Sequence, residues 1–169
     1  MIEEHRSHSR VITWEDPIGK VDTGKTFNGI EFLRAMQSGA LPAAPIMGLV
    51  GMWIAEVDEG RVVFAGEPAE EQYNPMGTVH GGIVALLLDS AMGSSVQSML
   101  PHGTSYTTLE LKVNYLRPVT SATGTIYGEG KLIHLGSRTA TAEGRLTDGA
   151  GELYAHATTT CLIVRPTSV

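Results

Sequence analysis

The feature that most limits what this chain can fold into is a long segment with almost no charge. From about residue 81 to residue 99 the side chains are apolar or small on every side of a helical projection, and Pro101-His102-Gly103 ends the segment. A surface helix needs a polar face, so this pattern predicts a helix that is surrounded by protein. The rest of the chain must supply the layer around it.

Strand patterns precede and follow this helix in the sequence. Asp58-Glu59-Gly60 separates apolar runs at 49–58 and 61–67, which predicts a hairpin. The run at 107–117 alternates, and its apolar face consists of Leu109, Leu111, Val113 and Tyr115. The runs at 138–146 and 153–163 have faces of alanine, glycine and threonine. Because these side chains are small, an element that packs on such a face must lie close to the strand backbone. The predicted fold class is α+β, with a curved antiparallel sheet wrapped around one long central helix.

The length of the chain allows one sizeable core and a short extension. It has 169 residues, close to the size of one ordinary domain. Asn28 and Glu31 have the spacing of a capping box, and Ile30, Leu33 and Met36 follow at helical spacing. The segment 41–45 contains two prolines and reads as a linker. We therefore predict an N-terminal extension with a short helix at 1–45 and the main domain at 46–169.

Charge and composition exclude several function classes. The formal net charge is −6, with 12 Lys and Arg against 18 Asp and Glu, which disfavours nucleic acid or a membrane surface as a partner. The first ten residues are polar and lack the apolar stretch of a secretory signal, so we expect a cytoplasmic location. Cys161 is the single cysteine, and the histidines follow no metal-ligand spacing, so no metal site is predicted.

Asp89 is the first candidate functional residue. It is the one acidic or basic side chain, histidine aside, between Glu71 and Glu110, and it lies in the middle of the predicted helix. A carboxylate in a dry site must be paired, neutralised or functional. Asp89 could simply accept hydrogen bonds from Ser90 or Thr108, but its isolation favours a functional role.

A second group of candidates lies at the start of the same helix. His80-Gly81-Gly82 places free N–H groups and the positive end of the helix dipole where a ligand can approach, which suits a developing oxyanion. His80 and Asp89 are nine residues apart, roughly 13 Å along a helix and half a turn out of phase. If both serve one site, Asn74, His80 and Gly81 come from one chain and Asp89 and Thr108 from another. This geometry predicts a homodimer with shared sites.

Two sequence motifs carry a family resemblance. The stretch N-P-M-G-T-V-H-G-G-I-V-A-L-L-L-D from Asn74 and the later T-T-L-E-L-K-V-N-Y-L-R-P closely resemble hotdog-fold acyl-CoA thioesterases of the phenylacetate-degradation (PaaI-like) group. The resemblance covers roughly residues 45–165. It implies the hotdog fold, hydrolysis of an acyl-CoA thioester to a free acid and CoA, and no cofactor, since CoA is part of the substrate. It is also compatible with dimers that pair into tetramers.

The resemblance also implies roles for individual residues. Asp89 activates water or attacks the carbonyl itself, and the Gly81 N–H polarises that carbonyl. Asn74 and His80 position the thioester or line the pocket, and Thr108 helps to hold the water.

Substrate contacts are expected on both sides of this centre. Residues 112–145 hold five basic and two acidic side chains, a local excess that suits the CoA phosphates. Gly136-Ser137-Arg138 is the preferred phosphate contact and Arg117 the second choice. Gly82, Met76, Leu86 and Tyr106 are expected to contact or line the substrate pocket.

Two other functions remain open from the sequence. One is a hotdog protein that binds acyl-CoA without cleaving it, and the other is a hotdog acyl-CoA dehydratase or hydratase. The combination of Asn74, His80 and Asp89 argues against pure binding. A dehydratase would need a catalytic histidine paired with an acid, whereas His80 lies at the helix start.

Overall fold

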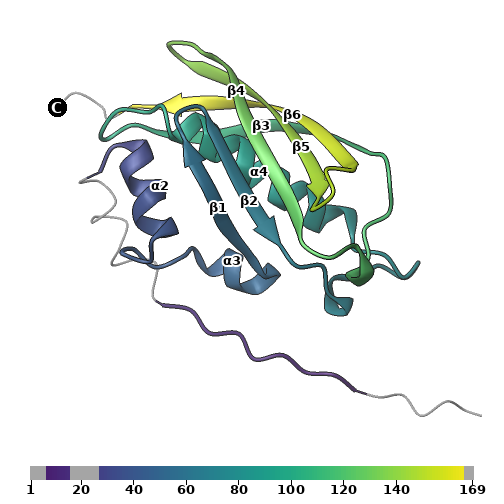
Figure 1. The fold of residues 1–169 in the computed structure, drawn as a ribbon. Coiled ribbons are helices and arrows are strands. Elements are labelled where there is room, and N and C mark those ends of the chain that lie inside the picture. The colour runs from purple at the N-terminus through teal and green to yellow at the C-terminus, as the bar shows by residue number, and fades with distance from the viewer. Residues whose placement is uncertain (1–6, 16–26, 166–169) are drawn as a thin grey trace, which may run out of the picture.

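One antiparallel sheet curves around one long helix (Figure 1). The computed structural model describes residues 7–15 and 27–165. Along the chain the elements are α2 (Gly29–Gln37), α3 (Pro45–Val50), β1 (Met52–Asp58), β2 (Arg61–Gly66), α4 (Gly81–Gln97), β3 (Ser105–Tyr115), β4 (Ile126–Leu135), β5 (Thr139–Asp148) and β6 (Leu153–Val164). The strand order is β1-β2-β4-β5-β6-β3, and every neighbouring pair is antiparallel. The predicted α+β class is confirmed.

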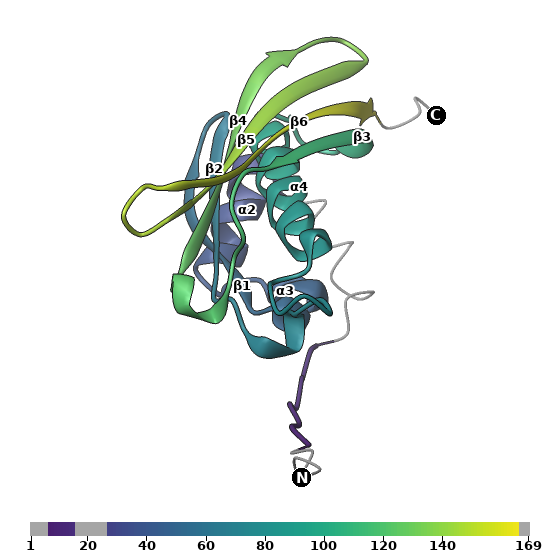
Figure 2. The ribbon, with the colours of Figure 1, turned by 90° about the vertical axis from the view of Figure 1, so that its right-hand side faces the viewer.

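The central helix lies on the concave face of the sheet (Figure 2). The C-terminal half of α4 is buried on all sides, from Ala91 to Val96. Its N-terminal half leaves one strip half-buried or exposed, formed by Gly82, Ala85, Leu86, Asp89 and Ser90. The prediction of a helix surrounded by protein therefore holds for one half only, because the sheet of one chain covers one side of α4.

Glycines on the inner face of the sheet allow the helix to approach. A Cβ atom at Gly130 on β4 would lie 2.3 Å from the main-chain carbonyl of Ala91. A Cβ at Gly128 would lie 2.0 Å from the Leu87 side chain, and one at Gly144 on β5 would lie 3.0 Å from Met92. The small-residue strand faces seen in the sequence thus pack in direct contact with the backbone and side chains of α4.

The alternation predicted for β3 is interrupted at one position. The register between β3 and β6 shifts between Thr108 and Glu110, which marks a β-bulge. Leu109 was expected on the same face as Leu111 and Val113, but it is 56% exposed while the other two pack against the core. An extra residue in the strand turns one side chain outward, and this explains the difference.

The N-terminal helix α2 packs against β1 and the end of α4. Asn28 and Glu31 form the predicted capping box. The Gly29 N–H donates to the Leu100 carbonyl at 3.0 Å, and the Gln37 amide donates to the Ala55 carbonyl at 2.8 Å.

The domain boundary at residue 45 stays a prediction. Within the described ranges, no helix combines the length and apolar character needed to cross a membrane.

The contact between β4 and α4 gives a stability prediction. Gly130→Ala places a methyl group against backbone that cannot rotate away, so we expect it to lower the free energy of unfolding by about 1–3 kcal/mol. Gly149→Ala is the matched control, since a Cβ there meets nothing within 4 Å. Urea denaturation of the two variants measures the difference. Equal stabilities would contradict the proposed close contact.

Candidate active site

Asp89 and Thr108 form a direct contact between the middle of α4 and strand β3. The Thr108 hydroxyl donates to Oδ1 of Asp89 at 2.9 Å. No donor among the described residues reaches Oδ2 of Asp89. The hydrogen bond weighed from the sequence as a purely structural alternative is therefore present, but it occupies one carboxylate oxygen and leaves the other for a ligand.

The Tyr106 phenol and the Cys161 thiol lie near Asp89, and both have a raised pKa. Burial raises the pKa of the Tyr106 phenol far above its usual range, and the charges of Asp89 and Cys161 add to this effect. Burial likewise raises the pKa of the Cys161 thiol, against the opposing hydrogen bonds of Thr159 and Thr108. A protonated phenol and thiol are poor bases and nucleophiles. Asp89 is thus the group at this point of the helix that is suited to basic or nucleophilic chemistry.

The N-terminus of α4 is capped by the histidine that precedes it. The Gly82 N–H donates to Nδ1 of His80 at 2.9 Å, so the imidazole accepts with an unprotonated nitrogen. The Gly81 N–H finds no acceptor among the described residues. The Tyr115 hydroxyl donates to the Gly81 carbonyl at 3.0 Å and so fixes this turn. Of the two glycines, Gly81 is the one that offers an N–H to a ligand.

The Asn74 side chain is engaged by its own loop. Its Oδ1 accepts from the N–H groups of Met76 at 2.9 Å and Thr78 at 3.3 Å, and its Nδ2 donates to the Thr78 hydroxyl at 3.0 Å. Gly77 has a φ of +77°, the left-handed conformation that this tight loop requires. Asn74 therefore shapes the segment that leads into His80. Met76, at the tip of the loop, is 83% exposed.

Within one chain the candidate residues form two separate groups. Asp89, Thr108 and Tyr106 lie together at the middle of the helix, and Asn74, His80 and Gly81 lie at or before its start. Gly81 and Asp89 are eight residues apart on α4, which is roughly 12 Å along the axis. One small reacting group cannot touch both in the same chain.

The expected phosphate contacts differ in their availability. Gly136-Ser137-Arg138 forms the turn between β4 and β5, where the Gly136 N–H donates to the Thr139 carbonyl at 2.8 Å. The exposed Arg138 side chain forms no ion pair within the described part of the chain. Arg117 is already engaged, since it donates to the Leu153 carbonyl at 2.7 Å and pairs with Glu152. Of these two expected contacts, Arg138 is the one whose side chain remains available to an anionic ligand.

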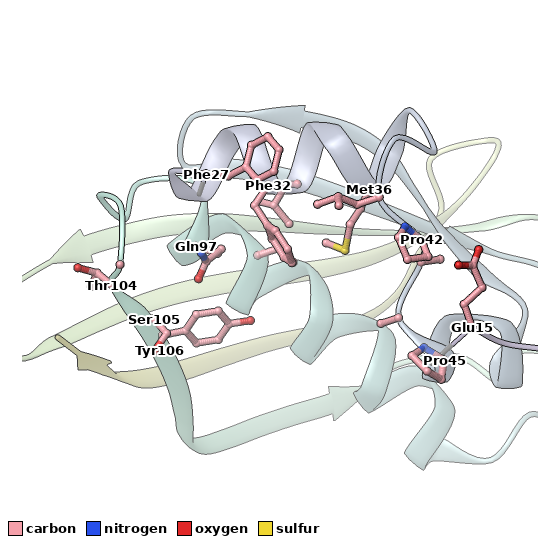
Figure 3. Close-up of a pocket in the computed structure, with 16 residues that line it drawn as sticks. Glu15, Phe27, Phe32, Met36, Pro42, Pro45, Gln97, Thr104, Ser105 and Tyr106 are labelled. Carbon is pink, nitrogen blue, oxygen red and sulfur yellow. The ribbon is translucent and has the colours of Figure 1, made fainter. Parts of the chain in front are cut away.

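A cavity of about 620 Å³ lies between α2, the segment 41–45, the C-terminal half of α4 and the start of β3 (Figure 3). Tyr106 lines it, whereas Met76 and Leu86, the other residues expected around the acyl group, do not. Sequence patterns do not reveal this cavity, because its walls come from segments that are distant in the chain. In the described ranges, no three histidine, cysteine, aspartate or glutamate side chains gather closely enough to hold a metal ion.

Comparison with known proteins identifies the family. The thioesterase superfamily matches residues 76–155. A phenylacetic acid degradation-related protein from Ralstonia eutropha JMP134, of known crystal structure, is 30% identical with a TM-score of 0.70, and the match covers 77% of this chain and 98% of that one.

Relatives also match at the sequence level, and two of them illustrate the range of similarity. A 1,4-dihydroxy-2-naphthoyl-CoA hydrolase from Listeria monocytogenes is 27% identical over 110 residues, which are 63% of this chain and 88% of the relative. A protein from Halobacterium salinarum is 41% identical over 69 residues, and there the match spans 40% of this chain and less than half of the relative, 44%. The chain belongs to the thioesterase superfamily, as a hydrolase of the PaaI-like group with the hotdog fold.

Proposed function

We propose that this protein hydrolyses an acyl-CoA thioester to a free carboxylic acid and CoA, at a site shared by two copies of the chain. The observation that carries the proposal is the Asp89 carboxylate, which Thr108 holds by one oxygen while the other is open. The membership of the thioesterase superfamily supports the reaction class. The Listeria relative, a naphthoyl-CoA hydrolase by name, supports a CoA ester as the substrate.

Asp89 can act in two ways at the thioester carbonyl. As a general base it takes a proton from a water molecule whose oxygen attacks the carbonyl carbon. As a nucleophile it attacks that carbon itself, and water then hydrolyses the resulting mixed anhydride. In both routes the carbon–sulfur bond breaks, the sulfur leaves with the electron pair as CoA thiolate and then gains a proton, and the acyl group ends as a carboxylic acid.

The N-terminus of α4 supplies the electrostatic part of the mechanism. The Gly81 N–H and the positive end of the helix dipole stabilise the negative charge that develops on the carbonyl oxygen. His80 holds the first turn by accepting from Gly82, and Asn74 holds the loop before it. In this proposal His80 and Asn74 are positioning residues. The turn Gly136-Ser137-Arg138 contacts the CoA phosphates through the exposed Arg138.

Two features support the participation of a second copy. The strip of α4 that carries Asp89 is only partly covered by its own chain, although it also contains the apolar Ala85 and Leu86. Strand β3 is an edge of the sheet and exposes Leu109, with Tyr115 and Leu116 near its end. A two-fold axis beside β3 would cover both surfaces and set Gly81 of one copy against Asp89 of the other. We propose a homodimer, with pairing of dimers into a tetramer as a further step.

The first prediction concerns the carboxylate. Asp89→Asn removes the base or nucleophile and should lower turnover of a hydrolysed acyl-CoA by about two to four orders of magnitude. Thr108→Val removes the hydrogen bond to Asp89 and should cause a smaller loss, about tenfold to a hundredfold. Thr107→Val, at the exposed neighbouring position, is the control. Release of free thiol measures the rates, and near wild-type activity of Asp89→Asn would remove Asp89 from the mechanism.

The second prediction concerns the shared site. Gly81→Pro removes the N–H donor and suits the first helical position, and His80 already has the extended backbone (φ −60°, ψ 133°) that precedes a proline. Gly81→Ala adds the same Cβ beside Tyr115 but keeps the N–H, so it serves as the control. We expect Gly81→Pro to be far slower than Gly81→Ala.

The activity of mixed dimers then distinguishes a site shared by two subunits from a site within one subunit. A heterodimer of Gly81→Pro and Asp89→Asn subunits retains one intact site out of two, so its activity should reach about half that of the wild-type dimer. Differently tagged subunits allow the heterodimer to be purified before the assay. Activity no higher than that of the two homodimers would refute the shared site.

A further inference from the structure

The cavity of about 620 Å³ has one apolar wall, and that wall comes from the N-terminal part of the chain. Residues 27–45 contribute this wall through Phe27, Phe32, Leu33, Met36, Leu41 and Pro42 (Figure 3). The opposite wall, from α4 and β3, includes the polar residues Ser94 and Gln97 together with Tyr106. A mostly apolar cavity of this size with a few polar groups on one side is typical of a pocket for a small organic group.

The cavity lies next to Asp89. Asp89, Gly93 and Gln97 follow one another at intervals of four residues and therefore share one face of α4. Tyr106 lies against this face, since a Cβ at Gly93 would be 2.2 Å from its hydroxyl. Thr108, two residues further along β3, bonds to Asp89. The lining residues of the cavity on α4, Ser94 and Gln97, lie five and eight residues beyond Asp89, roughly 8 and 12 Å along the helix axis, and Tyr106 lies between Asp89 and the cavity.

The wall is fixed in place by close packing. A Cβ at Gly29 would lie 1.7 Å from the Gln97 carbonyl, so α2 touches the backbone of α4 directly. The Leu41 N–H donates to the Ala35 carbonyl at 3.0 Å, which folds the segment 41–45 back onto α2. Leu33 is 2% exposed within the core. A wall held in this way defines the size of whatever enters the cavity.

We propose that residues 27–45 form the specificity wall of the acyl pocket, and that the substrate carries a bulky apolar acyl group, either aromatic or long alkyl. This inference rests on the proposed function, which places the thioester carbonyl at Asp89. From there the acyl group extends along α4 into the cavity, while CoA lies on the other side of the carbonyl. Acetyl is too small to reach the wall.

The wall lies outside the segment that matches the thioesterase superfamily, which begins at residue 76. The catalytic candidates Asp89 and Thr108 lie inside that segment, whereas α2 and the segment 41–45 precede it. Chemistry and acyl selection would then be carried by different parts of the chain. A change in the wall should alter selectivity while the chemistry at Asp89 is retained.

The test compares acetyl-CoA, phenylacetyl-CoA and decanoyl-CoA as substrates of the full chain. Wild-type protein should have a higher kcat/KM for the two bulky esters than for acetyl-CoA. Met36→Trp fills the cavity from α2, and should lower the ratio of kcat/KM for each bulky ester to that for acetyl-CoA by about tenfold or more, mainly through KM. Ala40→Trp adds the same ring at an exposed position between α2 and the segment 41–45 that does not line the cavity, so this control should leave the ratio unchanged.

A second variant protects the test against misfolding of Met36→Trp. Met36→Ala enlarges the cavity and should shift the preference from decanoyl-CoA towards dodecanoyl-CoA. The inference is overturned if wild-type protein prefers acetyl-CoA, or if thiol release continues with a ratio that neither Met36 variant changes. A different outcome, no thiol release by wild-type protein from any ester, overturns the proposed function and this inference with it.

Discussion

The structure depends on the close approach between the backbone of α4 and the glycines of the sheet. Gly130 lies so near the Ala91 carbonyl that no side chain fits between them. This contact lets a sheet of six strands curve tightly around a single helix. It also fixes the position of α4 along the sheet, and this position aligns Asp89 with Thr108 on β3 so that the two side chains form a hydrogen bond. The geometry of the candidate site thus follows from the packing on the opposite side of the helix.

Burial and exposure divide α4 into two functional halves. The C-terminal half is buried on all sides and carries the hydrophobic core. The N-terminal half presents Asp89 and the Gly81 N–H on or near a strip that its own chain leaves partly uncovered. Asp89, at the border between these halves, accepts from Thr108 through one oxygen, and in the proposed mechanism its other oxygen serves the reacting group. In that mechanism the same helix supplies both stability and chemistry.

Local patterns made most of the fold predictable from sequence, and tertiary contacts account for the rest. The hairpin around Gly60, the capping box of Asn28 and the helix from Gly81 each follow from residues close in sequence. The outward turn of Leu109 arises from a bulge against β6, which alternation alone does not reveal. The engagement of Asn74 by its own loop and the cavity beside Tyr106 also depend on the folded chain. From the sequence, Ser90 and Thr108 are both candidate hydroxyl donors to the isolated Asp89 carboxylate, and the folded chain pairs it with Thr108.

The spacing along α4 links assembly to activity in the proposed mechanism. An N–H at the helix start and a carboxylate eight residues later point to different places in one chain, since a helix is too rigid to bring them together. In the proposed homodimer a two-fold axis solves this problem, because each of the two sites takes Gly81 from one copy and Asp89 from the other. In the proposed mechanism the half-buried strip around Leu86 contacts the second copy and lies beside the reacting group. A separated chain would then hold the Gly81 N–H and the Asp89 carboxylate too far apart along α4 to serve one carbonyl group.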